Sequence, residues 1–255
     1  MSALPITKPP LTVCRKGELV RVYVWEWPVR MAHWCTAYAI LVLAATGLYM
    51  GHPFLISTGP AGSRFVMGWA KVIHSYAATV FALSVATRVA WMFLGNTYAR
   101  WDKFIPVSRR RLRGLVPTLR YYLFQLRQPP GFVGHNPLAG FTYTFVFLMF
   151  FTMIATGLAL YTVSAGVHSP FRVFSFLLPL VGGAQSARFI HHIVMWLILS
   201  FAVHHVYSSV LMSQVEARGT VESMASGYKF VPCEDLAYSG YRFLGDEKEV
   251  PHAGV

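Results

Sequence analysis

The sequence predicts an all-α membrane protein built as a four-transmembrane-helix bundle. Hydrophobic residues make up 55% of the 255 residues and charged residues 13%, and the mean hydropathy is +0.47. A soluble domain usually has about 25% charged residues. Four apolar stretches are also close to the roughly 20 residues that span a bilayer. In a soluble protein the net charge of +12 would suggest nucleic-acid binding, but here basic membrane loops account for it.

The four predicted spans are separated by turns and polar loops. The third span contains neither a charged residue nor a histidine, which makes it the clearest of the four. We assign the spans to one domain, which is followed by a short tail. The spans are 32–50, 65–94, 138–163 and 188–212, the transmembrane domain is 1–232, and the cytoplasmic tail is 233–255.

Basic residues are distributed unequally between the two sides of the predicted membrane. The loops after the first and third spans carry one each, Arg64 and Arg172, whereas the loop after the second span carries eight. Both terminal segments are also basic. Because positive loops stay in the cytoplasm, both termini are expected there. The three cysteines, Cys14, Cys35 and Cys233, fall on this side and are expected to be free thiols.

Segments outside the spans carry weaker signals. Residues 115–130 predict an amphipathic helix at the inner interface. Residues 170–183 predict a short interfacial segment on the outer side, and the chain after Gln214 is expected to be an extended cover or a partner contact. The first and third spans share an echo, AATGLYM and IATGLALY, which suggests a duplicated helix pair.

Histidines inside the predicted spans point to a functional site. Ionisable side chains at membrane depth are costly and usually functional. A lone histidine can serve as a hydrogen-bonding packing residue, but a set on three helices favours a shared site. The six are His33, His74, His191, His192, His204 and His205.

Helix geometry selects two of the four histidines in the last span. Positions 14 apart lie within about 40° of the same face and are separated by about 21 Å along the axis. His191 and His205 have this spacing, whereas spacings of 12 or 13 place residues on different faces. His192 and His204 therefore have another role or none.

The expected depth of each histidine in the membrane then indicates which partner His191 and His205 each have. The first span starts inside, so His33 matches the inner His205. The second and fourth spans start outside, so His74 matches His191. Ligands split between two depths argue against zinc and favour two stacked haems b, each held by two histidines. The chain has no CxxCH motif, so attachment is expected to be noncovalent. Bis-histidine iron has no open position, which favours electron transfer.

The same 14-residue spacing relates two further residues to these levels. Gly47 follows His33 and would let a porphyrin approach the backbone, although it could equally serve helix packing. Arg88 follows His74 and could pair with an inner haem propionate or extend to the interface. Arg64 and Arg188 could serve the outer propionates or anchor helix ends.

The motifs RVYVWEWPVRMAHW and GHNPLAG, together with His74 and the His191–His205 pair, resemble the cytochrome b subunit of nickel–iron uptake hydrogenases over residues 18–232. The resemblance implies a multi-pass protein of the bacterial inner membrane that anchors a periplasmic hydrogenase through its small subunit. Electrons would pass through two haems to respiratory-chain quinone. The chain would be the electron-transfer subunit, and hydrogen oxidation would occur in the partner. The implied haem ligands are His33, His74, His191 and His205.

The resemblance also suggests a quinone site. In related formate dehydrogenase subunits the loop before the third span lies near the quinone, which here places His135 and Asn136 beside it. Alternatively, Asn136 and Pro137 simply begin the helix.

Other functions remain possible from sequence. The chain could be the equivalent di-haem subunit of formate dehydrogenase or of another quinone-linked oxidoreductase. A transporter or channel with proton-relaying histidines would lack b-type haem bands. A self-contained transmembrane reductase would be active as a single polypeptide.

Overall fold

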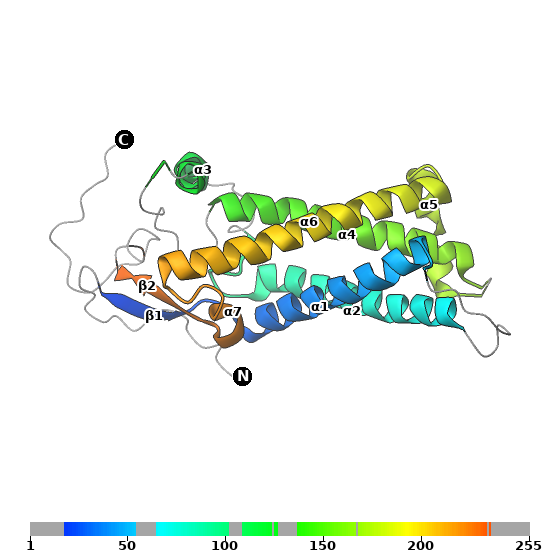
Figure 1. Cartoon of the computed structure of the whole chain (residues 1–255), viewed down its shortest axis with the longest axis horizontal. Helices are drawn as coiled ribbons and strands as arrows, with labels where there is room; N and C mark the ends of the chain where they lie inside the picture. Colours follow the sequence, from blue (N-terminus) through cyan, green and yellow to red (C-terminus); the bar gives the residue numbers. More distant parts are fainter. Residues whose placement is uncertain are drawn as a thin grey trace. The chain divides into compact units, whose positions relative to one another are not determined.

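The computed structural model describes residues 18–54, 65–101, 109–123, 125–126, 137–166, 168–233 and 235. Within them the chain is mostly helical, with one pair of short strands (Figure 1). The elements in chain order are β1 (Leu19–Tyr23), α1 (Trp27–Gly51), α2 (Val66–Leu94), α3 (Arg109–Tyr122), α4 (Pro137–Ser164), η2 (Pro170–Phe176), α5 (Leu177–Leu180), α6 (Ala184–Glu216), α7 (Ser223–Ser226) and β2 (Tyr228–Pro232).

The elements belong to two compact units, which are described separately. The bundle unit comprises Met31–Ala90 and Thr144–Ser208, and therefore holds most of α1, α2, α4 and α6. The strand unit comprises Met1–Arg30, Trp91–Tyr143 and Ser209–Val255, and its described part holds β1, α3, α7 and β2.

Among the described residues, four helices are long and apolar enough to cross a membrane. They are α1, α2, α4 and α6, and they confirm the four predicted spans. The largest difference is at the start of α1, which begins at Trp27 instead of residue 32. At about 1.5 Å per residue, the 33 residues of α6 exceed a hydrocarbon layer of about 30 Å. The ends of α6 therefore extend past that layer.

The core of the bundle unit lies midway along the four long helices. The rings of Phe81 and Phe150 meet edge to face with centroids 5.0 Å apart. Outward-facing side chains are apolar as well: Leu83 is 64% exposed and Val203 is 73% exposed. Lipid, rather than protein, is the natural cover for such a surface. The buried core residues are Ala39, Phe81, Val85, Val146, Phe150, Val194 and Ile198.

A short helical segment connects α4 to α6, as the sequence predicted for residues 170–183. It consists of the 3-10 helix η2, with Pro170 in its first turn, and the single turn α5. Gly182 and Gly183 follow with φ of +83° and +95°. Glycine adopts this left-handed conformation without strain, which allows the chain to turn before α6 begins at Ala184.

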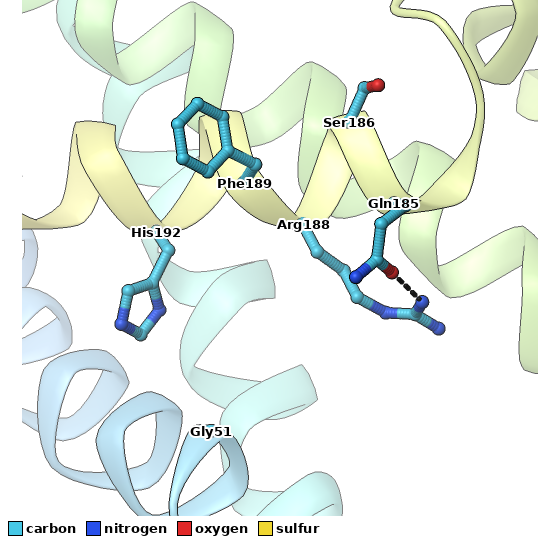
Figure 2. Close-up of a pocket in the computed structure, with 6 residues that line it drawn as sticks. All are labelled: Gly51, Gln185, Ser186, Arg188, Phe189 and His192. Atoms are coloured by element: carbon cyan, nitrogen blue, oxygen red, sulfur yellow. Dashed lines mark hydrogen bonds between the residues drawn. The ribbon is translucent and has the colours of Figure 1, made fainter.

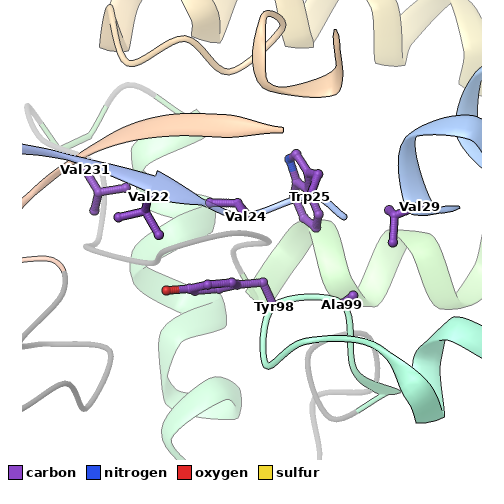
Figure 3. Close-up of a cluster of buried hydrophobic side chains, with 7 residues drawn as sticks. All are labelled: Val22, Val24, Trp25, Val29, Tyr98, Ala99 and Val231. Carbon is purple, nitrogen blue, oxygen red and sulfur yellow. The ribbon is translucent and has the colours of Figure 1, made fainter. Parts of the chain in front are cut away.

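The strand unit contains an antiparallel sheet that the sequence analysis missed. Leu19 of β1 pairs with Pro232 of β2, and Tyr23 pairs with Tyr228. The extended cover expected after Gln214 is thus wrong in part, because α6 continues to Glu216 and α7 and β2 follow. Buried side chains join the sheet to the start of α1 and the chain after α2 (Figure 3). They are Val22, Val24, Trp25, Val29, Tyr98, Ala99 and Val231.

Glu26 explains part of the VWEWPVRMAHW motif. Its Oε2 accepts hydrogen bonds of 2.8 Å from both the Trp91 indole and the Asn96 backbone N–H. The Asn96 side-chain amide in turn donates to the Val24 carbonyl over 3.0 Å. One carboxylate therefore ties the residue before α1 to the end of α2, within the strand unit.

Two predictions for the strand unit need correction. The helix expected over residues 115–130 is α3, but it begins at Arg109, ends at Tyr122 and contains Pro117. Cys233 is disulfide-bonded and is not a free thiol, whereas Cys35 is free as expected. Cys14 lies outside the described residues.

Candidate functional site

His74 lies in the first third of α2 and its ring faces α1. Its Nδ1 is 2.8 Å from the Oγ1 of Thr46. A Cβ added at Gly47 would lie 3.5 Å from His74 Cε1 and 3.9 Å from Met195 Sδ, both ordinary contacts. The ring therefore occupies a space bounded by α1, α2 and α6, in contact with the glycine position of α1.

His191 lies near the start of α6 and repeats this arrangement with α4. Its Nδ1 is 2.8 Å from the Oγ1 of Thr156, and a Cβ added at Gly157 would lie 3.4 Å from its Cε1. Met195, one turn after His191 on α6, lies beside the same Gly47 position as His74. The structure thus brings together the two histidines predicted for the outer level; we call them the threonine-bonded pair.

His33 of α1 and His205 of α6 form a second pair inside the bundle unit. Their ring centres are 6.2 Å apart and their planes are inclined at 58°. A metal–imidazole bond is about 2 Å long, so two imidazoles on opposite sides of one metal have ring centres roughly 6 Å apart. The observed separation therefore leaves room for one metal centre.

Aromatic rings surround this second pair, which we call the aromatic-flanked pair. The Phe201 ring stacks on His205 with centroids 5.5 Å apart, and Trp34 meets His33 edge to face at 5.1 Å. His33 Nδ1 is buried and has no hydrogen-bond partner among the described residues. Packing, more than hydrogen bonding, thus orients the His33 ring.

The neighbouring histidines of α6 point elsewhere. His192 and His204 are exposed, whereas His191 and His205 are half-buried. His192 lines an open pocket with Gly51, Phe189 and Arg188, and Arg188 donates to Gln185 Oε1 over 3.0 Å (Figure 2). The pocket contains one cationic side chain, but nothing within it ties Arg188 to either histidine pair.

The remaining predicted residues divide into two groups. Gly47 lies beside the threonine-bonded pair, and Arg88 is half-buried on α2. His135, Asn136 and Arg64 lie outside the described residues. The quinone contacts therefore stay predictions.

Thr46, Thr156 and Gly157 are site residues that the sequence analysis did not single out. A signal was present, since the echo between the first and third spans contains Thr46–Gly47 and Thr156–Gly157. It indicated duplication, but not that each Thr–Gly pair faces a histidine of the following long helix.

Four helices long and apolar enough to cross a membrane, with histidines inside the bundle, are typical of multi-pass membrane cytochromes. The sequence profile of prokaryotic cytochromes b561 matches residues 24–227. The chain belongs to this family, and it is a multi-pass membrane protein.

Individual relatives are similar over nearly their whole lengths. The "Probable Ni/Fe-hydrogenase B-type cytochrome subunit" of Cupriavidus necator is 38% identical over 81% of this chain and 86% of its own length. The protein of the same name from Rhizobium leguminosarum bv. viciae is 38% identical over 82% and 89%. The "Probable Ni/Fe-hydrogenase 1 B-type cytochrome subunit" of Escherichia coli K12 is 34% identical over 84% and 93%.

Proposed function

We propose that this chain conducts electrons across a bacterial inner membrane from a nickel–iron hydrogenase to quinone, and that it anchors the hydrogenase to the membrane. The names of relatives at 34–38% identity support a hydrogenase as the partner and a b-type cytochrome as the role. The same names favour hydrogenase over formate dehydrogenase, the alternative that the sequence left open.

The observation that carries the proposal is the presence of two histidine pairs inside one apolar bundle. The 6.2 Å separation of the His33 and His205 rings fits two side chains that would hold one haem iron between them. His74 and His191 each lie beside a glycine of a neighbouring helix, Gly47 and Gly157, which adds no side chain next to the ring. We therefore assign one noncovalent haem b to each pair. Bound haem supplies one-electron redox chemistry.

The residues of the chain restrict that chemistry to electron transfer. His33, His74, His191 and His205 would hold the haems, and iron held by two histidines would supply electron transfer rather than oxygen chemistry. Between the two pairs the core is apolar and contains the Phe81–Phe150 contact. Such a core excludes water and keeps the two sites apart.

The direction of transfer follows from the proposed orientation. Basic residues favour cytoplasmic termini, which places the threonine-bonded pair near the periplasmic face, on the side of the hydrogenase small subunit. The aromatic-flanked pair then lies near the cytoplasmic face. Quinone would be reduced at that end, with His135 and Asn136 as its predicted contacts.

The proposal is tested on the complex of the chain with its hydrogenase in membranes. A pyridine haemochrome assay should give two haems b per chain, and hydrogen should reduce both haems and then an added quinone. Absence of b-type bands would favour the transporter class. Haems that respond to formate but not to hydrogen would instead identify the alternative partner.

A further inference from the structure

We propose that Thr46 and Thr156 are positioning residues that fix the tautomer of His74 and His191, so that the Nε2 of each ring is the atom offered to metal. This inference rests on the proposed function, because it assumes that this pair holds a haem. Thr46 and Thr156 lie on different helices, and the inference predicts that both affect the same haem.

The hydrogen bonds of Thr46 determine which atom carries the proton. Its Oγ1 is 2.7 Å from the Val42 carbonyl of its own helix, and a carbonyl can only accept. The single hydroxyl proton is therefore used within α1. Toward His74 the hydroxyl can act only as an acceptor, so the Nδ1 of His74, 2.8 Å away, must donate. A neutral imidazole that is protonated at Nδ1 has its lone pair at Nε2.

Thr156 repeats the argument on α4. Its Oγ1 is 2.6 Å from the Thr152 carbonyl, one turn back along the helix, and 2.8 Å from Nδ1 of His191. The hydroxyl proton is again used within the helix, and His191 must donate from Nδ1. Both histidines of the pair are thus held in the same tautomer by a hydrogen bond to a threonine hydroxyl.

The glycine that follows each threonine completes the arrangement. Gly47 and Gly157 each lie beside the Cε1 of the histidine to which the preceding threonine is bonded. At Gly47 the added Cβ would also lie 4.0 Å from Nδ1 of His74, so this glycine faces the edge of the ring that carries the threonine-bonded nitrogen. Each threonine and the glycine after it thus lie beside the same imidazole.

A hydrogen bond from Nδ1–H makes an imidazole a stronger electron donor, and such outer partners orient and tune metal-bound histidines. A stronger donor stabilises the ferric state over the ferrous state. Removing the acceptor should therefore raise the midpoint potential of this haem. It should also weaken haem binding by about tenfold, the usual effect of removing a hydrogen-bond partner of a metal-bound histidine.

The test uses valine, which has nearly the shape of threonine but cannot accept a hydrogen bond. Thr46→Val and Thr156→Val are made in the full chain, together with its hydrogenase, and both haems are titrated by optical redox potentiometry and low-temperature EPR. Each variant should raise the potential and shift the EPR signal of one haem, which should be the same haem in both variants. Thr46→Ser keeps the acceptor and should restore values near wild type.

Thr79→Val is the matched control. Thr79 is exposed and makes the same hydrogen bond to its own helix, 3.0 Å to the Ser75 carbonyl, so this variant should leave both haems unchanged. The proposal is overturned if Thr46→Val and Thr156→Val affect different haems, or if neither moves a potential or an EPR signal.

Two further outcomes separate the possible failures. If Thr46→Val does not accumulate, Thr156→Val and Thr46→Ala test the same claim independently. If the unaltered chain binds no haem, the proposed function fails as well. If the chain binds haem but neither threonine variant changes a midpoint potential, only the present inference fails.

Discussion

The two histidine pairs of the bundle unit are held by different forces. In the threonine-bonded pair, the Nδ1 of His74 and of His191 each lies 2.8 Å from a threonine hydroxyl of a neighbouring helix. In the aromatic-flanked pair, Phe201 stacks on His205, and the buried Nδ1 of His33 has no hydrogen-bond partner among the described residues. One bundle therefore creates two unlike environments for chemically identical side chains.

This difference has a direct consequence for electron transfer. Hydrogen-bonded imidazoles favour ferric iron, whereas apolar surroundings disfavour the charge of the ferric centre. We expect the threonine-bonded pair to hold the haem of lower potential. In the proposed orientation, transfer from the periplasmic haem to the cytoplasmic haem is then favourable.

The largest expected effect is the loss of one haem at a time. His191→Ala should remove the haem of the threonine-bonded pair, and His205→Ala the other, because each iron would lose an axial ligand. Pyridine haemochrome assays should show the haem content of each variant falling by about half, since each pair is assigned one haem. The spectrum that remains should differ between the two variants.

His192→Ala is the control for this experiment. His192 is adjacent to His191 but is exposed on another face of α6, so its replacement should keep both haems. If His192→Ala removed a haem and His191→Ala did not, the assignment of ligands on α6 would be wrong.

An intermediate effect is expected at the two glycines. In the described structure a methyl group at Gly47 would make only ordinary contacts, and alanine is favoured over glycine in a helix by about 1 kcal/mol. Gly47→Ala and Gly157→Ala should therefore fold at least as well as the unaltered chain, yet retain several-fold less haem at the threonine-bonded pair. Haem content is measured alongside thermal stability.

Gly166 offers a comparison, because an added Cβ would meet nothing within 4 Å there. Gly166→Ala should leave haem content unchanged. If Gly47→Ala retained both haems in full, the glycine would serve helix packing alone and would not belong to a cofactor site beside His74.

The smallest effect is expected at the aromatic-flanked pair. Phe201→Leu removes the ring stacked on His205, a contact worth about 1 kcal/mol. The EPR signal and potential of that haem should shift slightly, and those of the other haem should not. If instead only the haem assigned to the threonine-bonded pair changed its EPR signal and potential, our assignment of the two environments would be reversed.

The sequence alone predicts the four spans and their approximate ends, because apolar length is a property of each segment by itself. The 14-residue spacing likewise separated His191 and His205 from their neighbours, since helix geometry is regular. The exposed positions of His192 and His204 agree with that choice of face.

Features that depend on two distant segments were not predictable in this way. The acceptor role of Thr46 becomes visible only when α1 lies beside His74 of α2, because threonine in a helix usually bonds to its own backbone. β1 and β2 are five residues each and are more than 200 residues apart in the chain. Neither strand has a partner close in sequence that would reveal it.

The pairing of β1 with β2 also constrains how the chain can be inserted. The two strands flank all four long helices in sequence, and hydrogen-bonded strands must share one side of a bilayer. Only an even number of crossings satisfies this parity. If one helix failed to insert, β1 and β2 would lie on opposite sides of the membrane. Each strand would then have an unpaired edge, which proteases could attack. The small sheet can therefore form only when the number of inserted helices is even, and only after the last helix has crossed the membrane.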